Sequence, residues 1–314
     1  MVTISMPHSR KACLAFILFL AASALSAGHR GVSVSIDDGR DPSRCEDLSI
    51  RIDDHRPERA QETIRVSETP GRVLKVRVPD HSGVRVVGTD RSDVEVTACK
   101  AAVSSGDLPR ISIVQRADEI SVDGPAGDSW VAYLLIAAPR GASLDLDAES
   151  APIGLRGLSG HVTARTVNGP ISLSDCPGEI DAEADNGPIH VSGSGGSLRL
   201  RTSNGPIGVR LSGTSWSGAG LDASAVNGPV DLVIPAGYRS GAVVESLGHA
   251  PVRCVGSACA DARRTWDENG DGHKRIELGA GPALVRLTTR NGPVSVRSGS
   301  GGASDEADED DESE

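Results

Sequence analysis

The stretch Asn168-Gly169-Pro170-Ile171 is one copy of a motif that returns through the second half of this 314-residue chain. From Pro152 to Pro206 the motif advances in steps of 18 residues. A fixed short period is typical of stacked units that bury an apolar face only against their neighbours. Full copies of Asn-Gly-Pro-Ile/Val begin at Asn168, Asn186, Asn204, Asn227 and Asn291, and degenerate copies contain Pro152 and Pro251.

Apolar residues alternate on both sides of each proline. Val162 and Ala164 precede Pro170 by eight and six positions, and Ile171 and Leu173 follow it by one and three. A period of two indicates strands. Asn-Gly tolerates positive φ and proline donates no ladder hydrogen bond, so the tripeptide suits a sharp corner between strands. Stacked corners would form an amide ladder. The corner residues are Asn168, Asn186, Asn204, Asn227 and Asn291.

These units predict an all-β chain: a parallel β-solenoid of about seven coils of 18–23 residues, with an N-terminal β capping region. A left-handed hexapeptide helix also has coils of 18 residues, but it repeats an aliphatic residue every six positions. Steps of six from Val162 reach Asn168 and Ser174. The hexapeptide helix and the acyltransferases that use it are therefore excluded.

Composition divides the chain into four segments. Residues 1–27 place Arg10 and Lys11 before an apolar run and small residues, as in a secretory signal peptide. Residues 28–140 are expected to form an N-terminal β cap. Residues 141–298 contain the repeats, with an insertion at 254–280. Residues 299–314 form an acidic tail whose composition is typical of disorder. No transmembrane anchor is expected after signal cleavage. In the cap, strands are expected at 48–52, 63–66, 73–78, 84–87, 94–98, 111–114, 119–122 and 130–137.

Outward positions before the prolines carry charges whose sign alternates from coil to coil. Opposite charges on neighbouring strands favour one register over a slip by one coil. Asp181 with Glu183 could instead form a catalytic carboxylate pair of the kind that glycoside hydrolases use. The neighbouring arginines disfavour this, because they hold both acids ionised. The successive pairs are Asp145/Asp147, Thr163/Arg165, Asp181/Glu183, Arg199/Arg201 and Asp222/Ser224.

Five cysteines follow the signal peptide. Exported proteins tolerate disulfides, and we expect Cys254 to pair with Cys259 and Cys45 with Cys99. Cys176 is left over and occupies the position that Leu158 has in the preceding coil, so we expect a small buried filler.

The insertion contains one motif suggestive of metal, Asp267-Glu-Asn269-Gly-Asp271-Gly. It matches the first half of a calcium loop, in which oxygens at alternate positions surround the cation. Asp267, Asn269, Asp271 and Glu277 are the candidate ligands, although Glu277 is at position 11 and the closing glutamate belongs at position 12. A polar hairpin turn between strands near 264–266 and 274–278 is the alternative. No other cofactor is expected.

The acidity of the chain is local. The formal net charge is −11, but residues 305–314 contain eight acids and no base, which leaves the remainder near −3. A nucleic-acid-binding surface needs a basic stripe, and none appears in the sequence, so no nucleic-acid partner is expected. The tail either only solubilises the chain or loosely captures cations or a basic surface.

Motifs of known catalysis are missing from the sequence. There is no nucleophile elbow, P-loop or dinucleotide fingerprint. Aromatic residues make up 2% of the chain, too few for the platforms of a sugar-binding cleft. Trp216 lies in a widened loop, residues 212–220, which is the strongest local candidate for binding beside a plain packing role. The sequence predicts a protein that is not an enzyme.

The chain resembles the bacterial putative-adhesin family of unknown function, whose β-solenoid proteins repeat Asn-Gly-x-Ile/Val coils. Residues 162–173, the lead-in 83–96 and the close 278–296 carry the resemblance, which covers most of residues 60–298. It implies a β-solenoid at the cell envelope with an adhesive role, and it offers no catalytic residues.

We therefore expect a monomeric bacterial protein, periplasmic or secreted, that binds an unknown envelope or surface component. Two other classes stay open: a self-assembling scaffold similar to bactofilins and a polysaccharide-active β-helix enzyme. The cap and the charged tail disfavour the end-to-end stacking that a scaffold needs, and the scarcity of aromatic residues disfavours the enzyme.

Overall fold

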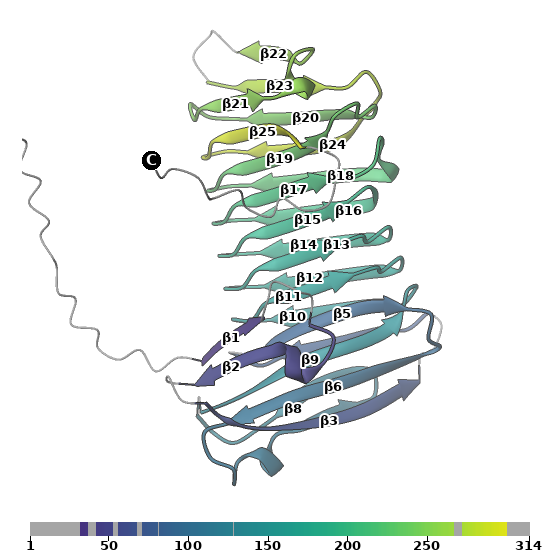
Figure 1. The fold of residues 1–314 in the computed structure, drawn as a ribbon, viewed down its shortest axis with the longest axis vertical. Helices are drawn as coiled ribbons and strands as arrows, with labels where there is room; N and C mark the ends of the chain where they lie inside the picture. Colours follow the sequence, from purple (N-terminus) through teal and green to yellow (C-terminus); the bar gives the residue numbers. More distant parts are fainter. Residues whose placement is uncertain are drawn as a thin grey trace, which may run out of the picture.

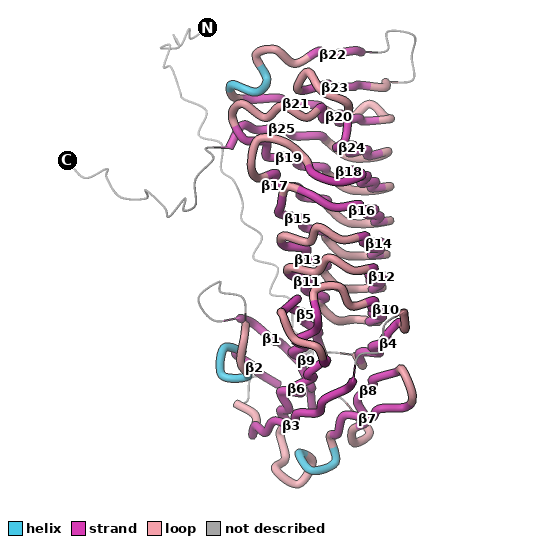
Figure 2. The backbone as a smooth tube through the Cα atoms, turned by 90° about the vertical axis from the view of Figure 1, so that its right-hand side faces the viewer, coloured by secondary structure: helices cyan, strands magenta, loops and turns pink. Residues whose placement is uncertain are grey.

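Two large sheets face each other along the length of the molecule (Figures 1 and 2). The computed structural model describes residues 32–36, 42–52, 56–67, 71–80, 82–127, 129–266 and 272–299. The predicted signal peptide and the chain beyond residue 299 lie outside these ranges. Within them the protein is all-β, with three short 3-10 helices, and no described helix has the length and apolar character needed to span a bilayer.

The twelve-stranded sheet is parallel from β20 to β8 and antiparallel at its two ends. In spatial order its strands are β22 (Arg263–Trp266), β23 (Lys274–Leu278), β20 (Gly241–Ser246), β24 (Ala283–Thr289), β18 (Ser217–Ala225), β16 (Gly195–Thr202), β14 (Glu179–Ala184), β12 (His161–Thr166), β10 (Ser143–Ala148), β4 (Val73–Val78), β8 (Glu119–Asp123) and β7 (Ser112–Arg116).

The eleven-stranded sheet is parallel from β21 to β9 and ends in two antiparallel pairings. In spatial order its strands are β21 (Val252–Val255), β25 (Val294–Gly299), β19 (Val230–Pro235), β17 (Ile207–Leu211), β15 (Ile189–Gly193), β13 (Ile171–Ser174), β11 (Ile153–Arg156), β5 (Gly83–Thr89), β9 (Trp130–Pro139), β6 (Asp93–Ala102) and β3 (Glu58–Ser67).

The core lies between the two sheets and is built from the alternating apolar positions. Residues one repeat apart are paired on adjacent strands, and their side chains are buried. Each fully buried aliphatic side chain contributes about 1.5–3 kcal/mol on transfer from water. The facing columns are Leu144, Val162, Ile180 and Leu198 in one sheet and Ile153, Ile171, Ile189 and Ile207 in the other.

The asparagine side chains at the corners are bonded in series. Each side-chain amide donates to the carbonyl oxygen of the preceding asparagine at 2.9–3.1 Å. Each corner glycine, in turn, lies so close to the preceding corner that a Cβ would overlap with a backbone carbonyl oxygen. The corner therefore needs asparagine for the hydrogen bond and glycine for the close approach of the backbones. The bonded series is Asn168, Asn186, Asn204, Asn227 and Asn291.

The last repeat in the sequence does not lie at the end of the stack. Strands β24 and β25 pair with β18 and β19 on one side and with β20 and β21 on the other. In Figure 1 the yellow β25 accordingly lies between the green β19 and β21. The repeat at Pro251 has His249-Ala250 in place of Asn-Gly, so it lacks both the ladder amide and the small residue that a continuing corner requires.

The insertion of residues 254–280 covers this end of the stack. It contains η4 (Ser257–Cys259) and the antiparallel strands β22 and β23, of which β23 also pairs with β20. The predicted disulfide between Cys254 and Cys259 is present, and Cys259 is buried. The antiparallel strands β22 and β23 cover the parallel edge of the twelve-stranded sheet, whereas β21 remains the edge strand of the eleven-stranded sheet.

At the other end, the two large sheets continue past residue 141 into the predicted cap. Strand β4 pairs with β10 and β5 pairs with β11, both parallel and in register with the repeats. The chain then leaves the repeats for β6, η3 (Leu108–Arg110), β7, β8 and β9 before it returns at β10. Both sheets therefore continue without interruption across the expected boundary between residues 140 and 141.

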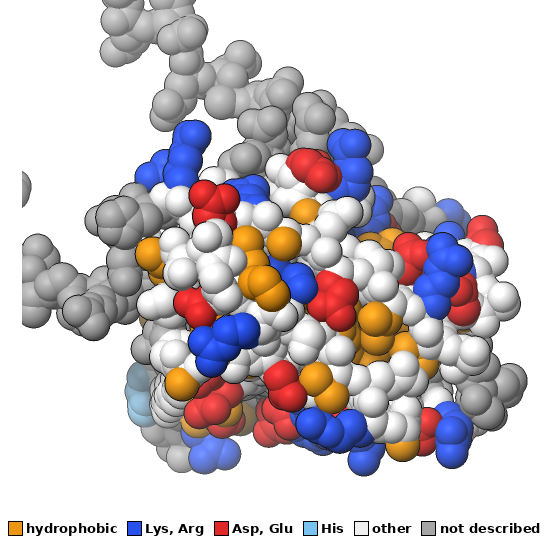
Figure 3. All heavy atoms as spheres, turned by 90° about the horizontal axis from the view of Figure 1, so that it is seen from below, with side chains coloured by type: hydrophobic (Ala, Val, Ile, Leu, Met, Phe, Trp, Pro, Cys, Tyr) orange, Lys and Arg blue, Asp and Glu red, His pale blue; other side chains and the backbone are white. Residues whose placement is uncertain are grey.

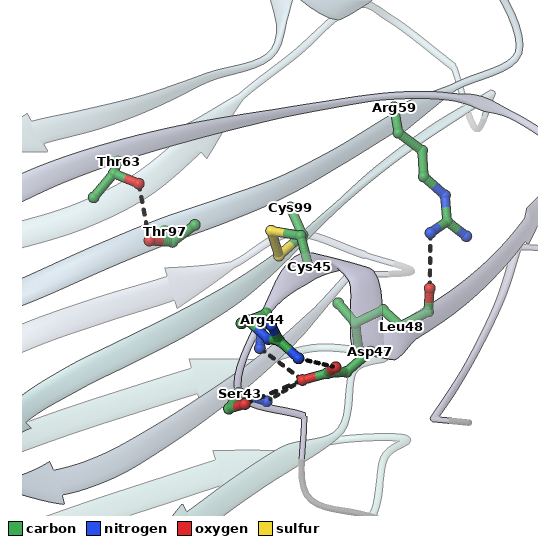
Figure 4. The surroundings of a disulfide bond; sticks show 9 residues. All are labelled: Ser43, Arg44, Cys45, Asp47, Leu48, Arg59, Thr63, Thr97 and Cys99. Carbon is green, nitrogen blue, oxygen red and sulfur yellow. Dashed lines mark hydrogen bonds and ion pairs between the residues drawn. A yellow bond between two sulfur atoms is a disulfide. The ribbon is translucent and has the colours of Figure 1, made fainter. Parts of the chain in front are cut away.

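A segment of residues 42–52 covers part of the outer face of the eleven-stranded sheet. It contains η2 (Cys45–Asp47) and β2 (Leu48–Ile52), which pairs with β1 (Val32–Ile36). The predicted disulfide Cys45–Cys99 joins this segment to β6, and Arg59 donates a hydrogen bond to the Leu48 carbonyl at 2.9 Å (Figure 4). A second buried apolar cluster, separate from the main core, lies beneath it.

Candidate functional site

The outer face of the twelve-stranded sheet is neutralised by its own charges. Arg77 lies 3.2 Å from Asp145, and Arg201 lies 3.3 Å from Asp181. Arg165 lies between the acids of both flanking strands, 4.0 Å from Asp145 and 3.9 Å from Glu183. These contacts are the opposite-charge neighbours expected from the alternating pattern. The carboxylates considered for catalysis are thus each held by an arginine.

The outer face of the eleven-stranded sheet is different, because it gathers arginines into one line. The strand registers place Arg156, Ser174, Ser192 and Arg210 on successive strands β11, β13, β15 and β17. The line continues through Val233 to Arg297 on β25. We call Arg156, Arg210 and Arg297 the arginine row.

The arginine row is accessible, and two of its members, Arg210 and Arg297, border a hollow. All three of its side chains are exposed. Among the described residues, no ion pair involves Arg210 or Arg297. The hollow, about 480 Å³ in volume, extends over β5 to β25 along the row and the adjacent line of outward positions. Other residues lining it include Arg85, Ser172, His190, Gly208 and Asp231.

The spacing of the row favours an extended anionic ligand. Three strand intervals separate Arg156 from Arg210 and two separate Arg210 from Arg297, which correspond to about 14 Å and about 10 Å. At physiological ionic strength the Debye length is about 8 Å, so the three charges are largely screened from one another and act as separate contact points for an extended ligand. A guanidinium group presents a donor fork that matches carboxylate and phosphate. Between the arginines, Ser192 Oγ donates to Ser174 Oγ at 3.2 Å, and these small side chains leave the row open.

No basic stripe is visible along the sequence, and the arginine row forms only when the strands are stacked. Arg156, Arg210 and Arg297 lie 54 and 87 residues apart, so no short stretch of the sequence contains two of them. A signal was nevertheless present, because each arginine stands four positions after a repeat proline, namely Pro152, Pro206 and Pro293. The alternating charges predicted from the sequence concern only the outward positions before the prolines. The expected absence of a nucleic-acid partner is a separate statement and stays a prediction.

The candidate calcium site is only partly within the described residues. Asp267, Asn269 and Asp271 lie outside them. Glu277 is described, and its carboxylate is bonded to Arg263 at 3.3 Å and to Arg275 at 2.7 Å. The described residues contain no cluster of three or more side chains suited to a metal. The flanking strands β22 and β23 match those expected for a polar hairpin, and calcium binding stays a prediction.

Two other residues singled out from the sequence have packing roles. Trp216 is 4% exposed, and its indole Nε1 donates to the Gly196 carbonyl at 3.0 Å, so the widened loop buries its aromatic ring. Cys176 is a free, buried thiol, as expected for a filler. Burial raises the pKa of the Cys176 thiol, which keeps it protonated and unreactive.

A second hollow, about 500 Å³ in volume, lies beside the Cys45–Cys99 disulfide. Its floor is formed by outward residues of β5 and β9, including Val87 and Leu135. Polar groups around it already bond each other: Thr63 to Thr97 at 2.9 Å and Arg44 to Asp47 at 3.8 Å (Figure 4). It is therefore a weaker candidate for an anionic ligand than the surface around Arg210 and Arg297, which no ion pair among the described residues involves.

The cap end of the molecule carries both signs of charge in close mixture (Figure 3). Ion pairs of this region join Arg65 to Glu95 at 3.1 Å and Arg72 to Asp118 at 2.9 Å. Such mixed surfaces create little net field. The arginine row is the candidate binding surface that remains on the described outer faces of the two sheets.

No protein-family model matches the chain, and no curated protein gives a significant match. Among solved structures, it is similar to a putative cell adhesion protein from Clostridium sporogenes, with 10% identity over 78% of this chain and 100% of that chain and a TM-score of 0.33. It is also similar to a putative adhesin from Bacteroides fragilis, with 9% identity over 77% and 98% and a TM-score of 0.33. A putative lipid binding protein from Parabacteroides distasonis matches at 10% identity over 76% and 96%, with a TM-score of 0.29. These similarities are too loose to assign a family.

Proposed function

We propose that the mature protein is a non-enzymatic, adhesin-like binding module of the bacterial envelope, whose arginine row holds an anionic component of a surface. The observation that carries this proposal is the line of Arg156, Arg210 and Arg297 on one open face, beside a facing sheet whose charges are internally paired. The proposed scaffold is a parallel β-solenoid of about seven coils, supported by parallel pairing at the repeat spacing.

Two features support export and a monomeric state. Both disulfides are of the kind that persist in an oxidising compartment, the periplasm or the exterior. Both sheets end in antiparallel strands at the cap, and the opposite end carries β22 and β23. These strands leave β21 as the one parallel edge strand among the described ends of the two sheets. A self-assembling scaffold would need parallel edges of both sheets to stack on, which favours a monomer over a bactofilin-like polymer.

The test compares ligand binding by the mature protein and by two variants of equal net charge. The row variant carries Arg156→Gln, Arg210→Gln and Arg297→Gln. The control variant carries Arg165→Gln, Arg199→Gln and Arg201→Gln on the outer face of the other sheet. Each is immobilised and presented with polygalacturonate, polyphosphate and a solubilised envelope fraction.

We expect the row variant to lose at least tenfold in affinity for one of the two polymers and to capture less of the anionic envelope material. The control variant should bind like the wild type. The carboxylate and phosphate polymers distinguish the two ligand chemistries. Equal loss in both variants, or no binding that depends on the row, contradicts the proposal. Sedimentation of the wild type at high concentration tests the monomeric state.

A further inference from the structure

We infer that the acidic tail, residues 305–314, occupies the arginine row of its own chain and competes there with external anions. The inference shares the binding face of the proposed function, but it concerns an intramolecular contact and is tested without an external partner. It rests on where the described chain ends, on the length of sequence that follows and on the charges of both segments.

The chain leaves the fold beside the row. Strand β25 carries Arg297 and ends at Gly299, two residues later. Because β11, β17 and β25 belong to one parallel series, the carboxyl ends of these strands lie at the same edge of the sheet. Arg156 is the last residue of β11 and Arg210 the penultimate residue of β17. The arginine row therefore follows the edge from which the tail departs.

The tail is long enough to reach every arginine of the row. Five residues, 300–304, separate β25 from the first acid, and they span at most about 18 Å when extended. The ten residues from Asp305 to Glu314 extend at most about 36 Å. Five strand intervals separate Arg297 from Arg156, a distance of about 24 Å. The acidic segment alone can therefore span the row.

The charges of the two segments are complementary. Residues 305–314 contain eight acids and no base, and the row supplies three exposed guanidinium groups. In extended chain, alternate side chains are about 6.6 Å apart, so carboxylates recur often enough to meet arginines about 10 and 14 Å apart. The outer face of the twelve-stranded sheet is a poorer partner, because Arg77, Arg165 and Arg201 already contact carboxylates. Among the described residues no ion pair involves Arg210 or Arg297, the two arginines of the row that lie nearest to the start of the tail.

Because the tail is tethered to the fold, even a weak interaction is sufficient for it to occupy the arginine row. A short flexible linker gives a tethered segment an effective concentration of about 1 mM. A tail with an untethered dissociation constant of about 100 µM would then occupy the row in most molecules and weaken a competitor about tenfold. External polyanions would have to displace the tail, which sets a threshold for binding.

The experiment measures binding of a fluorescein-labelled peptide of residues 300–314 by anisotropy at low ionic strength. The receptor is the full mature chain in three forms: wild type, a neutral-tail variant with Asp→Asn and Glu→Gln at all eight acidic tail positions, and the neutral-tail chain carrying the three substitutions of the row variant. A fourth form combines the neutral tail with Arg165→Gln, Arg199→Gln and Arg201→Gln.

We expect the peptide to bind the neutral-tail chain about tenfold more tightly than the wild type, because the wild-type row is already occupied. The row substitutions should abolish this binding, and the control substitutions should leave it unchanged. Binding should fall steeply between low and physiological salt. Equal affinity for wild type and neutral-tail chain would overturn the inference. Polymer binding that depends on the row, without any peptide binding, would overturn the inference alone and leave the proposed function standing.

Discussion

Asn291 donates its side-chain amide to the side-chain oxygen of Asn227 across 2.9 Å, although 64 residues separate the two in sequence. The repeat between them, with His249-Ala250 at its corner, lies beyond Asn291 in the stack. Neighbouring strands are therefore selected by the chemistry of the corner rather than by order along the chain. The antiparallel return of β23 on β20 is the local structure that makes this exchange possible.

The corner glycine of this last repeat should not tolerate a side chain. A Cβ at Gly292 would overlap with the Gly228 carbonyl oxygen, so Gly292→Ala forces the backbone apart and should lower the free energy of unfolding by about 1–3 kcal/mol. Gly141→Ala is the control, because open space surrounds that position and the substitution should be neutral or stabilising by about 0.4–1 kcal/mol. Urea denaturation followed by circular dichroism measures both. Equal effects would contradict the close-packed corner.

The asparagine ladder should show position-dependent energetics. Asn204 bonds both Asn186 and Asn227, whereas Asn168, at the beginning of the series, bonds only Asn186. At about 0.5–1.5 kcal/mol per hydrogen bond, Asn204→Ala should cost about twice as much stability as Asn168→Ala. Denaturation midpoints of the two single variants test this ratio. Similar small losses at both positions would mean that solvent replaces the ladder bonds.

Most strands could be predicted from sequence because their signals are local. Alternation alone located β2 at 48–52 and β4 at 73–78, with the bounds that the structure has. Along the repeats, the fixed offset from each proline placed Val162 on Ile180 and Ile171 on Ile189. A slip of one residue would expose an entire apolar face, so the burial pattern leaves a single register.

The remaining features depend on contacts between distant parts of the chain. Strands β24 and β25 lie next to β18 and β19 because the corner at Gly292 packs against the corner at Gly228. The period of the sequence does not predict this contact between distant repeats. The continuation of both sheets into β4 and β5 follows a long excursion and has no copy of the corner motif to mark it. The arginine row could not be recognised in the sequence, because each of its arginines belongs to a different repeat. Its three arginines become one surface only when the strands are stacked.

The charge pairs of the twelve-stranded sheet should contribute little stability individually. Arg201 and Asp181 are 47% and 36% exposed, so water screens their contact. A double-mutant cycle with Arg201→Gln and Asp181→Asn should give a coupling energy of about 0.2–1 kcal/mol, reduced further in 1 M salt. Their main effect is on register, because a slip by one coil places like charges together. A coupling energy well above this range would contradict the screened contact.

The two disulfides should differ in their contribution. Cys45 and Cys99 close a loop with a sequence separation of 54, and Cys254 and Cys259 one with a separation of 5. In the chain-entropy model these loops correspond to about 4 and about 2 kcal/mol of stabilisation. Replacing each pair by alanine and measuring thermal midpoints should therefore show the larger loss for Cys45 with Cys99. The opposite ranking would indicate that the 42–52 segment is held by its apolar contacts instead.

The free thiol of Cys176 should report on unfolding. Burial raises the pKa of the Cys176 thiol, so at about pH 9 a smaller fraction is thiolate in the folded protein than in the unfolded chain, and the folded protein also shields the sulfur from reagents. Its stabilising contribution is present below the unfolded pKa and declines as pH rises through the folded pKa. Iodoacetamide at pH 9 should leave the native protein unmodified and alkylate it fully in denaturant, as judged by intact mass. Cys176→Ala is the control, which should gain no adduct in either condition; rapid native labelling of the wild type would show that the site is open.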